Sequence, residues 1–183
     1  MVKKDILFLH GGGEKEDYDA DAKLVASLKA ELGVNYAIHY PFLSNDGTPD
    51  LGRRKQIAQE ISKRNDELII VAHSFGASML LATFSEMEIN KKVAGIFLVS
   101  TPFWTGNEDW VQPFKLKDGF EHKLDRNIPL FFYHTRDDDE VPFSQFIAYK
   151  QKLPWARFRE IPTGGHQLNN DLSMVALDIK QND

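Results

Sequence analysis

Residues 68–77 read Leu-Ile-Ile-Val-Ala-His-Ser-Phe-Gly-Ala and decide how this chain is expected to fold. The first four residues are apolar and mostly β-branched, as in a strand buried on both faces, and the residues from Phe75 on suit a buried helix. Between them, Ala72 to Gly76 fit the Gly-x-Ser-x-Gly nucleophile elbow, with alanine in place of the first glycine. The stretch therefore predicts a strand, a sharp turn that presents Ser74, and a helix.

Ser74 has two interpretations. A serine before a helix is usually only an N-cap, whose side-chain oxygen accepts a backbone N–H. In an elbow, the same position lifts the hydroxyl above the sheet edge at a helix N-terminus, where backbone N–H groups and the helix dipole favour developing negative charge. The rest of the chain has to decide between the two.

The composition predicts one globular domain over residues 1–183. The chain is 42% hydrophobic, and its 27 acidic against 22 basic residues give a formal charge of -5. One core is expected at this length, and the acidic balance argues against nucleic acid or an anionic membrane as a partner. The absence of cysteine excludes disulfides, thiolate metal sites and a cysteine nucleophile.

No targeting or membrane segment is expected. Lys3 and Lys4 precede an apolar stretch of only residues 6–9, which is too short for a signal-peptide core. No run approaches the roughly 18 apolar residues that a membrane span needs. We therefore expect a soluble cytoplasmic protein that is a monomer or a small homo-oligomer.

Strands and helices alternate along the chain. Besides 68–71, strands are expected at residues 5–9, 36–40, 93–100, 129–134 and 157–161. Helices are expected from about 19 or 21 to 33, at 51–64, 75–87 and 142–153, and from about 171 on. This alternation predicts βαβ units and a parallel sheet. Right-handed crossovers would then bring Gly11–Gly13, Ser74, the acidic cluster 137–140 and His166 to the same carboxyl edge.

The glycine run 11–13 follows the first strand directly. It either lets the backbone approach a ligand closely, with N–H groups exposed, or forms only a flexible loop. A dinucleotide site is not expected, because no G-x-G-x-x-G pattern is present and the acidic residues that follow would repel a pyrophosphate. We interpret those acidic residues as favourable charges at the start of the next helix. No metal or organic cofactor is expected.

A serine nucleophile needs a base within hydrogen-bond reach and a carboxylate that orients the base. Of the six histidines, His166 is the best placed, because it follows two glycines and precedes the last helix. His73 should point away from its neighbour Ser74. The cluster 137–140 offers four acids, of which one can hold the imidazole, while the others are read as solvated charges at a helix start. The order serine, acid, histidine is that of hydrolases with this elbow.

Residues 101–127 form a long stretch without a clear period. It carries five aromatic residues, Phe103, Trp104, Trp110, Phe114 and Phe120. Such a segment is either a lid or substrate-pocket insertion over a site, or a cover for the core. If it lines a pocket, we expect Phe103, Trp104 and Trp110 to contact the substrate.

Taken together, these motifs resemble those of the α/β-hydrolase superfamily, and the likeness covers nearly the whole chain. The matching pieces are residues 10–12, 72–76, 134–138 with Val141-Pro142, and 165–166. The short chain and the placing of the motifs are similar to the small single-domain serine hydrolases related to retinoblastoma-binding serine hydrolase. Ala72, in place of the first elbow glycine, and Thr135, where the acid motif usually has glycine, depart from the pattern. Neither change removes a reacting group.

The resemblance implies a three-layer α/β-hydrolase fold, with about six mostly parallel strands in the order 2-1-3-4-5-6 and helices on both faces. It also selects Asp138 as the acid, from its register after a strand-end histidine and before a Val-Pro pair. It implies an oxyanion hole made by the N–H of Phe75 and of a glycine in the run after the first strand. Gly12 is the first choice, and Gly11 and Gly13 are the alternatives.

The function expected from these residues is that of a serine hydrolase. Ser74 would attack a small carboxylic ester or related acyl substrate, with Asp138 and His166 as its partners, and form an acyl-enzyme. The same site could instead serve amide, thioester or peptide substrates. A third hypothesis is a non-catalytic interaction module on a hydrolase scaffold, since a fold alone does not determine a function.

Overall fold

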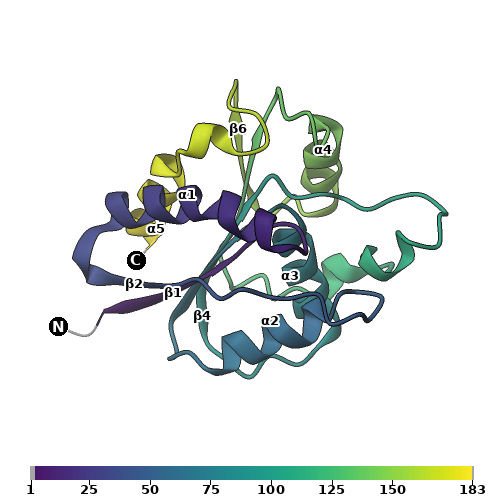
Figure 1. Ribbon diagram of the computed structural model, residues 1–183, viewed down its shortest axis with the longest axis horizontal. Helices are drawn as coiled ribbons and strands as arrows, with labels where there is room; N and C mark the ends of the chain where they lie inside the picture. The colour runs from purple at the N-terminus through teal and green to yellow at the C-terminus, as the bar shows by residue number, and fades with distance from the viewer. Residues whose placement is uncertain (1–2, 183) are drawn as a thin grey trace.

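A computed structural model describes residues 3–182 (Figure 1). Its six strands form one sheet in the order β2-β1-β3-β4-β5-β6, and every neighbouring pair is parallel. The strands are β1 (Lys4–Leu9), β2 (Tyr36–His39), β3 (Leu68–His73), β4 (Val93–Val99), β5 (Leu130–Thr135) and β6 (Arg157–Ile161). The predicted sheet order and its parallel pairing are confirmed.

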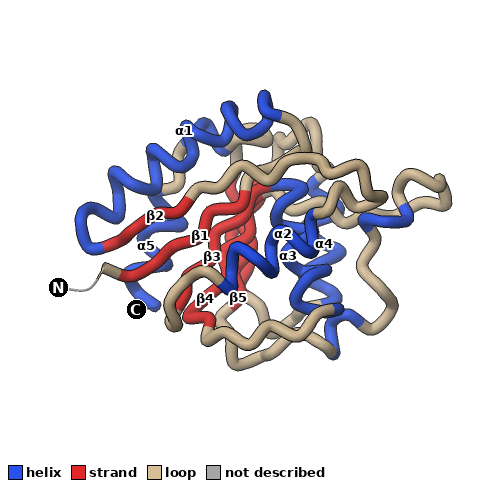
Figure 2. Tube along the Cα trace, turned by 60° about the horizontal axis from the view of Figure 1, so that its bottom comes forward, coloured by secondary structure: helices blue, strands red, loops and turns tan. Residues whose placement is uncertain are grey.

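Helices cover both faces of the sheet (Figure 2). They are α1 (Lys15–Leu32), α2 (Arg53–Ser62), α3 (Ser74–Glu86), α4 (Phe143–Lys152) and α5 (Ser173–Asn182). α1 and α5 pack on one face, and α2, α3 and α4 pack on the other. Alternate strand side chains serve the two cores, since Ile6 and Phe8 of β1 belong to the first and Leu7 and Leu9 to the second. The architecture has three layers, as predicted.

β3 lies at the centre of the sheet and carries the elbow. All six of its residues are buried, which explains its unbroken apolar run. Strand order reverses between β1 and β3, because β1 is followed by β2 on one side and β3 lies on the other. In open α/β sheets, ligands bind outside the carboxyl ends of the strands at such a switch point. The glycine run after β1 and Ser74 after β3 flank it.

The first helix begins earlier than expected. α1 starts at Lys15, not near Asp19 or Asp21, because Glu14 and Asp17 form a reciprocal capping box around the first turn. Asp21, one of the two positions considered for the helix start, is therefore not a helix-start residue. Asp21 lies within the helix, is buried, and accepts a hydrogen bond from the glycine run.

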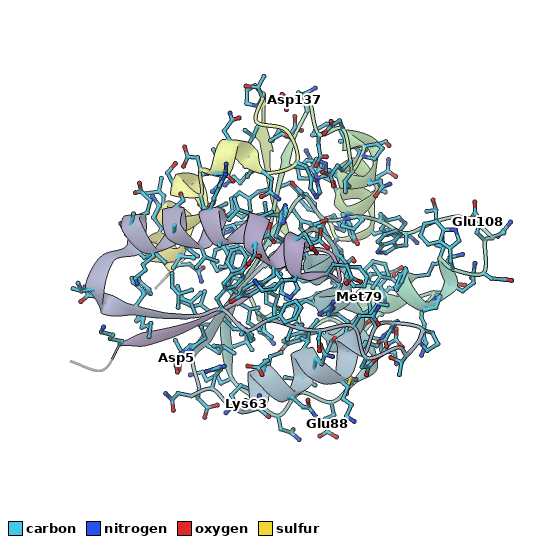
Figure 3. All side chains as sticks on the ribbon, in the orientation of Figure 1. Asp5, Lys63, Met79, Glu88, Glu108 and Asp137 are labelled. Carbon is cyan, nitrogen blue, oxygen red and sulfur yellow. The ribbon has the colours of Figure 1, made fainter. Side chains whose placement is uncertain are left out.

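The connection 101–127 between β4 and β5 projects beyond the sheet (Figure 1), and Glu108 lies at its outer end (Figure 3). Two short 3-10 turns, at Gln112–Phe114 and Phe120–His122, interrupt it. Phe120 is only 4% exposed and packs into the core, whereas Trp110 is 63% exposed. Part of the segment therefore covers the core, and its role as a lid or substrate-pocket insertion stays a prediction.

No helix within residues 3–182 combines the length and the apolar character needed to cross a membrane.

Candidate active site

Ser74 occupies a strained turn between β3 and α3. Its φ is 49°, which is uncommon for a residue with a side chain and is the conformation of a sharp strand-to-helix turn. A Cβ at Gly76 would lie 2.3 Å from the carbonyl oxygen of His10, so only glycine fits there. Ala72 is fully buried, and its methyl group belongs to the core cluster on the face of the sheet that α2 and α3 cover. The elbow therefore forms with alanine at its first position.

Three predicted residues meet above the sheet. The Ser74 hydroxyl donates to His166 Nε2, with Oγ and Nε2 2.9 Å apart. On the other side of the ring, His166 Nδ1 donates to the Asp138 carboxylate at 2.9 Å from Oδ2. Ser74 begins α3 directly after β3, whereas Asp138 and His166 lie in the loops after β5 and β6. This is the geometry in which a base can take the proton of a serine while a carboxylate holds the base.

Asp138 is buried and well supplied with donors. Its Oδ1 accepts the backbone N–H of Val141 at 2.8 Å and that of Glu140 at 3.0 Å. Burial raises the pKa of this carboxyl, but the hydrogen bonds from His166 and the two backbone N–H groups outweigh it and lower the pKa overall. Asp138 is therefore an anion at neutral pH.

The other acids of the cluster differ from one another. Asp137 is exposed and accepts the N–H groups of Gly164 and Gly165, which fastens the loop before His166. Asp139 is exposed, as expected for a solvated charge. Glu140 points toward the site, with its Oε2 3.6 Å from His166 Nε2 and its side chain 68% exposed. Only Asp138 contacts Nδ1 of the histidine at hydrogen-bond distance.

The electrostatics of His166 favour its protonated form. Burial lowers the pKa of this imidazole, but the hydrogen bond to Asp138 and the charges of Asp138 and Glu140 outweigh it and raise the pKa above its ordinary value. A base with a raised pKa accepts a proton more readily, but more of it is already protonated in mild acid.

This pKa shift predicts the pH dependence of any reaction that uses His166 as a base. The activity kcat/KM should fall as the pH decreases through the raised pKa of His166. The fall in kcat/KM on the low-pH side is the acid limb of the pH profile. Glu140→Gln removes a negative charge from beside Nε2 of His166, so this acid limb should move to lower pH. Ester hydrolysis between about pH 5 and about pH 9 measures this. An acid limb that stays in place in Glu140→Gln, or moves to higher pH, contradicts the prediction.

The glycine run presents one free N–H group. Gly11 N–H donates to Asp21 at 2.7 Å, and Gly13 N–H donates to Asp17 at 3.1 Å. Gly12, whose φ is 56°, has no hydrogen-bond partner for its N–H within the described residues. Phe75 N–H lies in the first turn of α3, where N–H groups lack an intrahelical acceptor.

His10 sets the direction of the Gly12 N–H. Its Nε2 accepts the N–H of Leu43 at 3.0 Å, so its Nδ1 carries the proton and donates to the carbonyl of Gly11 at 2.6 Å. The Gly11 carbonyl and the Gly12 N–H belong to one trans peptide unit and point in opposite directions. Burial lowers the pKa of His10, and the charge of Arg53 lowers it further, which keeps the ring neutral. The Gly12 N–H therefore cannot turn without breaking this bond.

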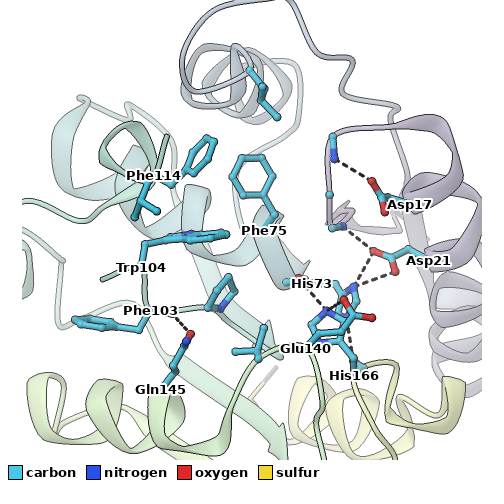
Figure 4. A pocket seen from close by; sticks show the side chains of 18 of the residues that line it. Asp17, Asp21, His73, Phe75, Phe103, Trp104, Phe114, Glu140, Gln145 and His166 are labelled. Atoms are coloured by element: carbon cyan, nitrogen blue, oxygen red, sulfur yellow. Dashed lines mark hydrogen bonds and ion pairs between the residues drawn. The ribbon is translucent and has the colours of Figure 1, made fainter. Parts of the chain in front are cut away.

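Ser74 lines a cavity of about 590 Å³. Figure 4 shows this cavity from close by. Aromatic and aliphatic side chains form one wall, and they are Leu51, Phe75, Phe103, Trp104, Trp110, Val111 and Phe114. Trp104 is oriented by its Nε1–H, which donates to Ser78 Oγ at 3.0 Å. The three pocket residues singled out from the sequence all line the cavity. Phe114 lines the cavity as well and packs edge-on against Phe75, with the two ring centroids 5.1 Å apart.

Four carboxylates line the same cavity, those of Asp17, Asp21, Glu108 and Glu140. Among the described residues, neither lysine nor arginine lines it. Within residues 3–182, no group of three or more histidine, aspartate or glutamate side chains is arranged to hold a metal ion.

Sequence reasoning gave no role to three buried residues near the site, Arg53, Asp21 and His73. Arg53 donates to the carbonyls of Leu43 and Gly12 and lies over the Phe75 ring. Asp21 and His73 form a hydrogen-bonded pair behind the glycine run. His73 hydrogen-bonds Asp21 and not Ser74, in agreement with the expectation for its direction. No spacing signal links these residues, since even His73 and Asp21 lie 52 positions apart along the chain.

The family model described as serine hydrolase matches residues 51–173. This range is more than half of the chain and includes Ser74, Asp138 and His166. The chain belongs to this serine hydrolase family. The glycine run precedes the matched range. Among curated proteins, none matches the sequence of this serine hydrolase.

Solved structures resemble this serine hydrolase in fold. The ydeN gene product from B. subtilis is 20% identical, with a TM-score of 0.69 and 98% of each chain covered. SOBER1 from Arabidopsis thaliana is 19% identical, with a TM-score of 0.67 and 99% of each chain covered. The esterase domain of a Rhodothermus marinus protein is 16% identical, with a TM-score of 0.65, covering 99% of this chain and 86% of that one. At these identities, the likeness establishes the fold.

Proposed function

We propose that this serine hydrolase cleaves a small carboxylic ester or related acyl substrate through an acyl-enzyme on Ser74. The observation that carries the proposal is the continuous hydrogen-bond chain from Ser74 Oγ through His166 to Asp138, with both links at 2.9 Å. Ser74 attacks the carbonyl carbon while its proton passes to His166 Nε2, and His166 then gives that proton to the leaving alcohol. Water repeats the sequence on the acyl-enzyme. Asp138 stabilises the imidazolium in both halves.

The negative charge of the tetrahedral intermediate needs donors placed in advance. We assign this role to the N–H groups of Phe75 and Gly12. Gly11 and Gly13 are less suitable, because Asp21 and Asp17 already accept their N–H groups. The helix dipole of α3 adds positive potential at the same place.

The pocket suits an apolar acyl group of modest size. Its volume of about 590 Å³ lies within the usual range for small-molecule sites, and one wall is aromatic. A structural neighbour is an esterase domain, which is in line with ester substrates. Amides, thioesters and peptides would use the same reacting groups, so a substrate panel has to rank these leaving groups. A purely non-catalytic role would leave the hydrogen-bonded chain at Ser74 without a purpose.

The charge of the pocket predicts a preference among esters. Neutral p-nitrophenyl butyrate should be hydrolysed with a kcat/KM about fivefold or more above that of the p-nitrophenyl monoester of succinate. A carboxylate about 4 Å from even one of the pocket acids costs about 1 kcal/mol in water, which corresponds to about a fivefold change in rate. Added salt and the Glu108→Gln variant should both narrow the difference. Equal kcat/KM values for the two esters, unaffected by salt, contradict the prediction.

A fluorophosphonate probe tests the proposal directly. The folded protein should be labelled once, with the label on the peptide that contains Ser74, and heat-denatured protein should not be labelled. Labelling that maps to another serine would remove Ser74 from its role. A folded protein that neither reacts with the probe nor hydrolyses any ester of the panel supports the interaction module instead.

A further inference from the structure

A second histidine–aspartate pair lies directly behind the reacting groups. His73, the last residue of β3, and Asp21, in α1, are each only 1% exposed. His73 Nδ1 lies 2.9 Å from the Asp21 carboxylate. The rings of His73 and His166 are 4.8 Å apart between centroids (Figure 4). The mechanism described above makes no use of this pair.

The pair connects the two loops that the reaction needs. At one end, Asp21 accepts the N–H of Gly11 at 2.7 Å. Gly11 directly precedes Gly12, whose N–H is the proposed oxyanion donor. At the other end, His73 Nε2 donates to the backbone carbonyl of His166 at 3.1 Å. Ser100 Oγ donates to the same carbonyl at 2.9 Å, and Gln167 donates its side-chain amide to Asp21 at 3.1 Å. The pair and its partners therefore link the two loops by a continuous set of hydrogen bonds.

The hydrogen-bond partners determine the protons on His73. One ring nitrogen faces a carboxylate and the other faces a carbonyl, and neither group can donate. Both ring nitrogens thus face hydrogen-bond acceptors, an arrangement that favours an imidazolium, whose positive charge would neutralise Asp21. Without this charge, a buried carboxylate at 2.7 Å from Gly11 N would oppose the negative charge that develops beside Gly12.

We propose that Asp21 and His73 are a positioning pair, which aligns His166 with the glycine run and allows a carboxylate to anchor that run without opposing the oxyanion. The inference rests on the proposed function of Ser74. Neither residue touches the reacting atoms, and both act through His166 and Gly11. A buried pair with only a structural role would change the stability of the protein and leave the chemistry as it is.

The charges that face His166 define a readout that separates these roles. Asp138 contacts Nδ1, Glu140 lies 3.6 Å from Nε2, and the His73–Asp21 pair packs against the ring. His134 lies beyond Asp138, with its Nε2 3.4 Å from Oδ2. Because Asp138, Glu140 and His134 stay unchanged in the variants below, a movement of the acid limb reports on the pair.

His73→Gln and His73→Asn each remove one half of the connection. The glutamine amide can replace the Nε2 donor toward the His166 carbonyl but leaves Asp21 without its counter-charge. The asparagine amide can replace the Nδ1 donor toward Asp21 but releases the His166 carbonyl. We expect both variants to lower kcat and the fluorophosphonate labelling rate by about 10-fold to 100-fold, with KM changed less than about twofold, because small misplacements of reacting groups act on kcat.

The pH profile gives the sign of the charge effect. In His73→Gln, the uncompensated Asp21 favours protonated His166, so the acid limb should move to higher pH. Adding Asp21→Asn to His73→Gln removes that charge and should return the acid limb to its wild-type position, although the rate stays low. This double variant measures the coupling between the two residues.

His39→Gln is the matched control. It breaks another histidine–aspartate hydrogen bond, in which His39 Nε2 lies 2.9 Å from Asp5. Asp5 is at the beginning of β1 (Figure 3), which is the end of the parallel sheet away from Ser74. The His39→Gln variant should have the kcat and the acid limb of the wild type. Thermal unfolding of every variant establishes that each is folded at the temperature of the kinetic measurements.

The outcomes for the pair and for the proposed function are distinguishable. If the wild type is labelled at Ser74 and His73→Gln keeps the wild-type rate and acid limb, the inference is overturned and the proposed function stands. If the wild type is not labelled, the proposed function itself fails. Nitrogen-15 NMR of wild-type histidine side chains needs no variant. Two protonated ring nitrogens on His73 at neutral pH support the proposal, and a single one overturns it.

Discussion

Ser74→Ala should abolish fluorophosphonate labelling and lower the turnover of short p-nitrophenyl esters by about a millionfold, the loss seen when a comparable serine site loses its nucleophile. The size of the loss follows from the geometry. His166 Nε2 has the Ser74 hydroxyl as its partner at 2.9 Å, and without it no acyl-enzyme can form. The variant would still hydrolyse esters faster than water alone does, because the pocket and the oxyanion donors remain.

The control for this variant is Ser85→Ala. Ser85 lies on the same helix, and its hydroxyl donates only to the carbonyl of Ala82, away from the cavity. It should keep both labelling and turnover. Ser74→Ala should remain folded, because the substitution removes a single oxygen atom at the mouth of the cavity. Retained hydrolysis in a folded, unlabelled Ser74→Ala protein would assign the reaction to another nucleophile.

Asp138→Asn should lower kcat by about ten-thousandfold, with little change in KM, as when the carboxylate of a comparable triad is replaced. The asparagine oxygen can still accept the N–H groups of Val141 and Glu140, so the loop keeps its shape. The amide, however, cannot stabilise the imidazolium, and its NH₂ group can donate to Nδ1 and select the wrong tautomer of His166.

Asp139→Asn is the matched control, because this neighbouring carboxylate is exposed and does not contact His166. It should retain wild-type kcat. Steady-state kinetics of the two variants at one pH above the acid limb provide the comparison. Equal losses in both would show that the acid cluster acts through its total charge and not through the bond to Nδ1.

Much of the fold follows from local patterns. The buried strand β3 was recognisable over residues 68–71, because a short, apolar and mostly β-branched run suits a strand covered on both faces, and the structure extends it to His73. Its elbow was recognisable because Gly76 must be small, and the structure supplies the reason in the nearby His10 carbonyl. The start of α1 was misplaced. Glu14 and Asp17 cap each other across three positions, a pairing that the run of acidic residues conceals.

The sequence by itself determined the alternation of strands and helices, and it placed Ser74, Asp138 and His166 after strands that share one edge. That inference works because parallel crossovers bring strand ends together whatever the loops contain. Only the tertiary structure decided that Asp21 hydrogen-bonds His73. The same holds for His10, which orients the peptide between Gly11 and Gly12, and for Arg53, which donates to the carbonyl of Gly12. These contacts join residues from separate elements, and a buried charge reveals its partner only after packing has excluded water from both.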